Sequence, residues 1–248
     1  MRARCLSGSN SMERRAGRQT VPFLAEVLTM MRRNKIALRC SCRVLITACL
    51  FSVMLLASSP IFGAEPDTVR VEEEWVIEIG LPVPKLSAPQ VVMVISPTAS
   101  TDDKIAVFEL NHATFPKFRP GGMQLHLWDG DHLRSVSTAP QLQVLGVAEE
   151  TIQFTSRMRL DGGNLIVEVR NGKSTSWGTF GGAGQLRCSA ASHLKNLNEY
   201  RSAVSKKHSR IAFGSHRVKK LMLSEVRYYS KDGLITKETT DQIVHQHQ

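Results

Sequence analysis

Residues 151–169 read TIQFTSRMRLDGGNLIVEV. Two runs rich in apolar and β-branched side chains, 151–160 and 164–169, flank Asp161-Gly162-Gly163. Such a pattern predicts a β-hairpin, because glycine adopts the positive φ angles that a tight turn between two strands requires. The stretch therefore indicates antiparallel β-structure.

On both sides of this hairpin, apolar side chains tend to recur at every second residue of the chain. In residues 74–79, Trp75, Ile77 and Ile79 alternate with Glu74, Val76 and Glu78, as expected for a strand with one buried face. Further strands are predicted at 91–96, 105–110, 123–128 and 221–230, and the region 194–205 is predicted to add a helical turn or two. Turns are predicted at Asp129-Gly130, Asn171-Gly172 and Asp232-Gly233, and three prolines within 81–90 predict a connection. About eight or nine short strands of this kind predict a sandwich or a barrel.

The N-terminal region has the composition of a secretory signal peptide. Ten of the 32 basic residues lie in residues 1–43, followed by the uncharged run VLITACLFSVMLLA at 44–57. This run of 14 residues is shorter than the roughly 18–20 residues that a membrane-spanning helix needs, so no permanent span is expected in the mature chain. We predict cleavage near residues 63–64, with Met30 or Met31 as the possible true start, and export to the periplasm, cell envelope or medium.

Most of the excess positive charge and most of the cysteines lie in this N-terminal region and not in the predicted mature chain. Residues 44–248 carry 22 basic and 20 acidic side chains, so the excess charge gives no evidence for specific nucleic-acid binding. Four of the five cysteines precede residue 65, which leaves Cys188 in the mature chain, either as a core residue or as one half of an intermolecular disulfide. Residues 65–248 suit a single domain.

Several segments together resemble a known fold family. The succession FELNH (108–112), GGMQLHLWDGD (121–131), VEVRNG (167–172) and TSWGTFGG (175–182) is similar to the concanavalin A-like and laminin-G-like jelly-roll sandwiches. It resembles more closely secreted bacterial proteins of that shape with no assigned activity. The resemblance covers most of residues 71–235. It implies an all-β, antiparallel jelly-roll β-sandwich that often presents a face for carbohydrate or protein, and it implies no particular activity.

Metal and catalytic patterns are weak. The histidines at 112, 126 and 132 lack metal-ligand spacing, although Asp129-Gly130-Asp131 could help to hold calcium in a loop. A sandwich glycosidase needs two carboxylates about 5–9.5 Å apart. The acidic side chains Glu72, Glu74 and Glu78 instead share one face of a strand, as on a solvated surface. No G-x-S-x-G motif is present, and we therefore predict that the chain is not an enzyme.

Two groups of residues are candidates for ligand binding. Trp128, Asp129, Asp131 and Trp177 include aromatic rings that could stack on a sugar, although Trp177 also fits a core position beside its glycine-rich bend. Residues 200–224 contain no Asp or Glu, and this basic stretch could attract an acidic polymer or could be balanced in space by Glu72–Glu74 or by Glu149 and Glu150. The basic candidates are Lys206, Lys207, Arg210, Arg217, Lys219 and Lys220.

From these features we predict a secreted, non-catalytic binding module whose partner is an extracellular carbohydrate or polyanion. No cofactor is expected beyond a possible calcium ion. Two alternatives remain: a structural or interaction protein of the cell envelope, which an exposed edge strand would favour, and a glycan-cleaving hydrolase.

Overall fold

The computed structural model describes residues 66–80, 89–111, 122–139, 149–175, 177–182 and 184–247. The chain divides into two units, Met1–Leu50 and Phe51–Gln248, and all described residues lie in the second. The predicted signal peptide, its cleavage site and most of the proline-rich connection lie outside the described residues. Within the described residues, no helix is long and apolar enough to cross a membrane.

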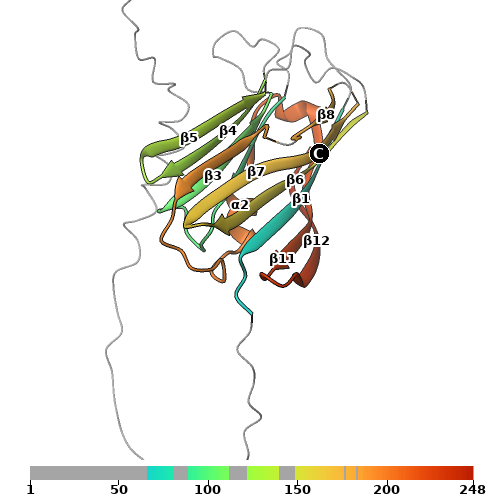
Figure 1. Ribbon diagram of the computed structural model, residues 1–248. Coiled ribbons are helices and arrows are strands. Elements are labelled where there is room, and N and C mark those ends of the chain that lie inside the picture. The colour runs from blue at the N-terminus through green and yellow to red at the C-terminus, as the bar shows by residue number, and fades with distance from the viewer. Residues whose placement is uncertain are drawn as a thin grey trace, which may run out of the picture. The chain divides into compact units, whose positions relative to one another are not determined.

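Two antiparallel β-sheets pack face to face (Figure 1). The seven-stranded sheet has the order β12-β11-β1-β6-β7-β8, with β9 also paired to β7, and the five-stranded sheet has the order β10-β2-β3-β4-β5. The predicted all-β sandwich is therefore confirmed. The strands are β1 (Arg70–Ile79), β2 (Gln90–Ile95), β3 (Lys104–Leu110), β4 (Met123–Asp129), β5 (His132–Ala139), β6 (Glu150–Asp161), β7 (Asn164–Ser174), β8 (Gly178–Phe180), β9 (Arg187–Ala191), β10 (Arg210–Phe213), β11 (Val218–Tyr229) and β12 (Leu234–Gln246).

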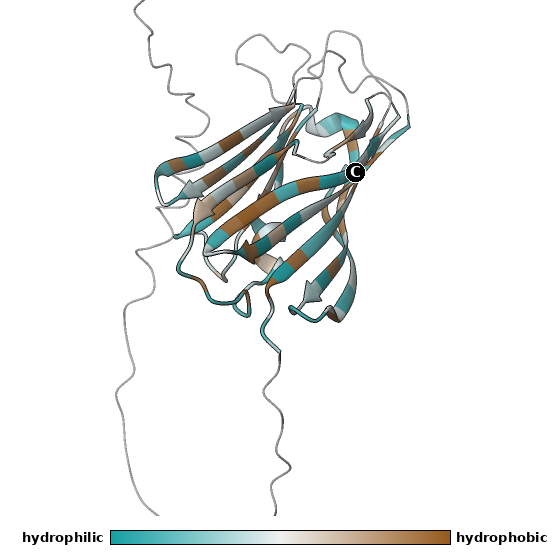
Figure 2. Ribbon diagram, viewed as in Figure 1, coloured by the Kyte–Doolittle hydropathy of each residue, from teal (hydrophilic) through white to brown (hydrophobic). Residues whose placement is uncertain are grey.

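The core lies between the sheets and follows the alternation seen in the sequence. Along β1, every second residue from Val71 to Ile79 is buried, and Figure 2 shows the same alternation of hydrophilic and hydrophobic residues along neighbouring strands. Phe154 of β6 meets Phe108 of the opposite sheet edge-to-face, with ring centroids 5.3 Å apart. Cys188 is 1% exposed and belongs to this core, which confirms its predicted core position.

The predicted hairpins form where glycine or aspartate follows a strand. Asp161 pairs with Asn164 across a two-residue loop in which Gly162 and Gly163 both have positive φ angles, +55° and +76°. This geometry matches the right-handed twist of the flanking strands. Gly130 likewise has a φ of +56° in the turn between β4 and β5.

The predicted turn at Asn171-Gly172 is corrected by the structure. β7 continues through both residues to Ser174, and its register with β6 shifts at this point because β7 carries an additional residue. Asn171 adopts a φ of +54°, which asparagine tolerates better than most residues. The dipeptide therefore forms a β-bulge within a continuous strand.

The C-terminal half contains two further differences from prediction. The expected helical turns at 194–205 occur later, as α2 (Ser202–His208), and a 3₁₀ turn, η2 (Ser215–Arg217), precedes β11. β12 was not predicted as a strand, because its sequence LITKETTDQIVHQ is polar and nearly all of it is exposed. It pairs with β11 along its length, with three register shifts.

Candidate functional site

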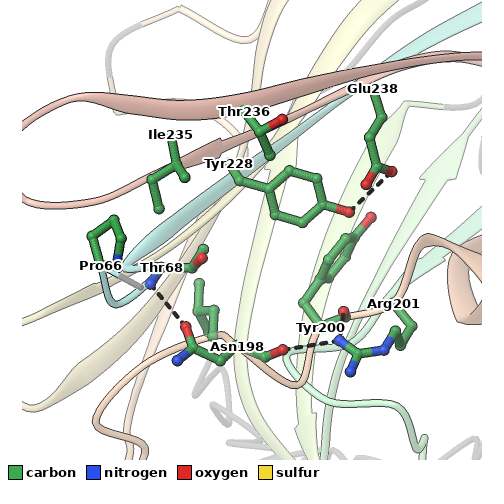
Figure 3. Close-up of a pocket in the computed structure, with 10 residues that line it drawn as sticks. Pro66, Thr68, Asn198, Tyr200, Arg201, Tyr228, Ile235, Thr236 and Glu238 are labelled. Carbon is green, nitrogen blue, oxygen red and sulfur yellow. Dashed lines mark hydrogen bonds between the residues drawn. The ribbon is translucent and has the colours of Figure 1, made fainter. Parts of the chain in front are cut away.

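A pocket of about 410 Å³ lies between the β11–β12 hairpin and the loop that precedes α2 (Figure 3). Tyr228 comes from β11, and Ile235, Thr236 and Glu238 come from β12. Tyr228 and Thr236 are register partners, so their side chains lie on the same face of the sheet. The other lining residues are Pro66, Thr68, Leu197, Asn198, Tyr200 and Arg201.

The loop wall is fixed to the segment that enters β1. The amide of Leu197 donates to the carbonyl of Thr68 at 2.7 Å, and the amide of Thr68 donates to Oδ1 of Asn198 at 2.8 Å. Arg201 Nη1 donates to the carbonyl oxygens of Asn198 and Tyr200 at 2.9 and 2.6 Å. These bonds hold the loop as a defined wall opposite the hairpin.

Two tyrosine rings meet in this pocket. The rings of Tyr200 and Tyr228 are edge-to-face with centroids 5.7 Å apart, and the Tyr228 hydroxyl donates to Oε2 of Glu238 at 3.3 Å. Burial, together with the Glu238 carboxylate, raises the pKa of Tyr228 to about 12, so the hydroxyl stays protonated and can act as a donor. The pocket thus combines aromatic surface with hydroxyl, amide, carboxylate and guanidinium groups.

A buried carboxyl group lies directly behind Tyr200. Glu73 of β1 is 1% exposed. It accepts hydrogen bonds from the hydroxyls of Tyr200 and Ser205, both at 2.5 Å, and from Nε1 of Trp75 at 3.0 Å. Burial raises the pKa of Glu73 above its ordinary value of 4.5, although all three hydrogen bonds and the charge of Lys206 oppose that shift. This carboxyl group joins β1, the pocket loop and α2.

The raised pKa of Glu73 predicts a pH dependence of stability. The folded state holds its proton to higher pH than the unfolded state, so the free energy of unfolding should fall as pH rises from 4.5 through the folded-state pKa. Each unit of that difference corresponds to about 1.4 kcal/mol. In urea unfolding at a series of pH values, Glu73→Gln should flatten this fall, whereas Glu238→Gln at an exposed position should retain it. An unchanged slope in Glu73→Gln would contradict the assignment.

In the predicted calcium loop, Asp129 forms ion pairs with two basic side chains. Oδ2 of Asp129 lies 3.2 Å from Nζ of Lys104 and 3.2 Å from Nη2 of Arg134. The hydrogen bond from Lys104 is the main reason why the pKa of Asp129 is lowered. Asp131 is exposed in the turn. Among the described residues, no group of three or more His, Cys, Asp or Glu side chains could hold a metal ion.

The two predicted tryptophans lie in different environments. Trp128 is half-buried on the outer face of β4, where its ring is edge-to-face with His126 at 6.2 Å. Nε2 of His126 lies 3.0 Å from Oε1 of Gln124. Trp177 is 8% exposed and belongs to the hydrophobic core, which leaves little of its ring for a ligand. The structure therefore does not bring the two rings together: Trp128 lies on the outer face of β4 and Trp177 lies in the core.

The basic candidates are spread over α2, β10, η2 and the start of β11. Lys219 pairs with Glu149 at 2.5 Å. Arg217 is 5% exposed; burial lowers its pKa, and the charge of Glu150 opposes that shift. Nζ of Lys206 donates to Oε1 of Gln242 at 2.5 Å. Lys207 is exposed, and Arg210 and Lys220 are half-buried.

The acidic face of β1 is neutralised by basic residues of neighbouring strands. Arg227 of β11 forms ion pairs with Glu72 and Glu74, and Arg157 of β6 does so with Glu168 of β7. A single cross-strand row connects these charges from β12 to β9 through Lys237, Arg227, Glu72, Arg157, Glu168 and Arg187. Glu72 and Glu74 thus lie on an outer, charge-balanced face, as the alternation predicted.

Sequence reasoning missed the pocket. Of the residues predicted to bind a ligand, none is among the described residues that line it. A signal for Glu73 was present, because counting back by two from Trp75 places it on the inner face. No comparable local signal marks Tyr200, Tyr228 or Glu238, which come from three separate segments.

Comparison with known proteins yields little. No protein-family model matches the sequence, and no curated protein matches it. Among solved structures, the chain is similar to SCP-B, a member of the Eqolisin family of peptidases, in a complex with the tripeptide Ala-Ile-His. The identity is 12% and the TM-score 0.26, over 72% of this chain and 83% of that one.

The prediction that the chain is not an enzyme is corrected by this match and is not retained, because the neighbour found is a peptidase. A TM-score of 0.26 nevertheless carries no argument for any particular activity of this chain.

Proposed function

We propose that the protein is a carbohydrate-binding module and that the pocket between the β11–β12 hairpin and the Asn198–Arg201 loop is its binding site. One observation carries the proposal: the half-buried ring of Tyr228, with the buried ring of Tyr200 edge-to-face behind it, lines the same pocket as Asn198, Arg201 and Glu238. A sugar ring has an apolar C–H face and a rim of hydroxyl groups, so it requires aromatic surface beside mixed donors and acceptors.

The dimensions and charge of the pocket favour a neutral saccharide. Its volume of about 410 Å³ falls within the range of small-ligand sites. The described lining residues bring one carboxylate, Glu238, and one guanidinium, Arg201, so the two charges balance. An acidic saccharide, the predicted polyanion, would meet the Glu238 carboxylate.

The proposal extends to the fold type and the location of the protein. We propose a jelly-roll sandwich of the concanavalin and laminin-G kind that is exported by an N-terminal signal peptide. The jelly-roll fold type is supported by the path of the chain, which passes repeatedly between the sheets, from β1 to β2, from β5 to β6 and from β9 to β10. Export is supported by the basic segment that precedes a short apolar run at 44–57.

The alternative of a structural envelope protein receives less support. β12 is a long edge strand, as a self-associating protein would need. However, its pairing with β11 is interrupted by three register shifts, and bulges of this kind discourage edge-to-edge pairing.

A glycan array, with calcium and with EDTA, tests the proposal. We expect the full-length protein to bind a neutral glycan in both conditions, and Tyr228→Ala to weaken binding by about 2 kcal/mol, or roughly thirtyfold. Trp128→Ala is the matched control, since it removes an aromatic ring outside the pocket and should leave affinity unchanged.

The reverse pattern, with binding lost in Trp128→Ala and kept in Tyr228→Ala, would move the site to the β4–β5 turn. Binding that disappears with salt and in Lys207→Ala would instead assign it to the basic residues. Absence of binding across the array by folded protein would contradict the carbohydrate proposal.

A further inference from the structure

We infer that Glu73 is the positioning residue of this pocket and that the charge on its carboxyl group decides how firmly Tyr200 is held in the pocket wall. The inference rests on the proposed function for its ligand. Its structural basis is the hydrogen-bonded group of Glu73, Trp75, Tyr200 and Ser205, which no motif in the sequence marks.

The hydrogen bonds assign a separate role to each carboxylate oxygen. Oε1 accepts from both Tyr200 and Ser205, and Oε2 accepts from Nε1 of Trp75. Tyr200 is 2% exposed, and it lies in the pocket wall with its ring edge-to-face against the half-buried ring of Tyr228. Through this ring contact, the buried carboxyl group is connected with the surface that a ligand would contact.

Ionisation of Glu73 strengthens this connection. A carboxylate accepts all three hydrogen bonds, and bonds to a charged acceptor are roughly twice as strong as neutral ones. A protonated carboxyl group must also place its own proton, which competes with the surrounding donors for an oxygen. Protonation should therefore loosen Tyr200, and with it the loop wall of the pocket.

The surroundings of Glu73 raise the pH at which this change occurs. Among the described residues, the titratable or charged groups whose influence reaches Glu73 are Tyr200, Tyr228 and Lys206. The five-stranded sheet and strands β6 and β7 contribute apolar side chains and Ser156, around a cavity of about 10 Å³ beside Glu73. Burial in this setting raises the pKa of Glu73 above 4.5, so its ionisation falls above the range of an ordinary carboxyl group.

The inference gives ligand affinity and stability opposite pH dependences. As pH rises through the pKa of Glu73, the fold loses stability because a charge is buried, while the pocket wall becomes better ordered. Ligand affinity should therefore rise over the interval in which the free energy of unfolding falls. If Glu73 had a merely structural role, its ionisation would change the free energy of unfolding without raising ligand affinity.

Nuclear magnetic resonance can test the inference without a ligand, because the chain has three Trp and three Tyr residues, and each can be assigned by substitution. In a pH series on the full-length protein with ring-labelled tyrosine, the Trp75 indole N–H and the Tyr200 ring signals should move together with one midpoint above 4.5. Both should stay constant in Glu73→Gln. Tyr228→Phe, which leaves the Glu73 hydrogen bonds intact, should keep the Trp75 titration.

Ser205→Ala is a second variant, which keeps the test possible if Glu73→Gln does not fold. It removes one donor to the carboxylate, so the common midpoint should move to higher pH. A Tyr200 signal that does not follow Trp75, a titration that persists in Glu73→Gln, or a midpoint unmoved in Ser205→Ala would each overturn the inference.

The ligand measurement separates this inference from the proposed function. In a Glu238→Gln background, which removes the carboxylate that lines the pocket, the affinity for the array-selected glycan should rise with pH, and adding Glu73→Gln should abolish the rise. Equal pH profiles with and without Glu73→Gln would overturn the inference and leave the carbohydrate proposal standing. If Trp75 and Tyr200 titrate together but the protein binds no glycan, the role of Glu73 stands and the carbohydrate proposal is contradicted.

Discussion

Replacing Gly181 by alanine is expected to lower the free energy of unfolding by about 2–5 kcal/mol, from roughly 1–2 kcal/mol of backbone strain and 1–3 kcal/mol of overlap. Gly181 has a φ of +71°, and an added Cβ would lie 2.5 Å from the carbonyl oxygen of Val169. That oxygen belongs to the backbone of β7, a central strand, and cannot rotate away. The glycine therefore permits the close approach of two chain segments.

Gly182→Ala is the matched control for this prediction. The neighbouring glycine is exposed, and an added Cβ would meet no atom within 4 Å. Urea unfolding of the two variants should show Gly181→Ala strongly destabilised and Gly182→Ala within about 1 kcal/mol of the parent protein. Equal stability of the two would show that the close approach of Gly181 to β7 is absent in solution.

Replacing Phe154 by alanine is expected to cost about 3–5 kcal/mol, which is the usual range for a buried phenylalanine. Phe154 is 1% exposed and contacts Phe108 of the opposite sheet at 5.3 Å and Phe180 at 6.2 Å between ring centroids. The alanine variant would lose both aromatic contacts and leave a cavity between the sheets.

Phe154→Leu separates the loss of volume from the loss of the aromatic ring. Leucine retains most of the apolar volume, so we expect a cost of about 1–1.5 kcal/mol in the same unfolding measurement. A small effect of Phe154→Ala, close to that of Phe154→Leu, would indicate that the two sheets are not packed through this ring.

The sequence by itself determined the class of fold and much of its local geometry. The turn at Gly162-Gly163 and the alternation along β1 are local signals, because a tight turn needs particular φ angles and a half-buried strand needs a period of two. The same alternation places Glu72 and Glu74 outside and Glu73 inside.

Other local patterns permitted more than one structure, and packing decided between them. Asn171-Gly172 fits a turn or a bulge, and its pairing with β6 made it a bulge. Trp177 fits a binding loop or the core, and the space between the sheets made it a core residue. β12 has little apolar character of its own and becomes a strand because β11 presents an edge to it.

The candidate site depended on tertiary structure almost entirely. Tyr200, Tyr228 and Glu238 belong to a loop and two strands, and neither their identities nor their spacing indicates that they meet. Lys219 and Glu149 lie 70 positions apart, and their ion pair is the balance of charge that the sequence offered as one alternative and that only the packing selects. Periodicity and turn chemistry act over a few residues, whereas a pocket is made by residues that only the packing of distant segments brings together.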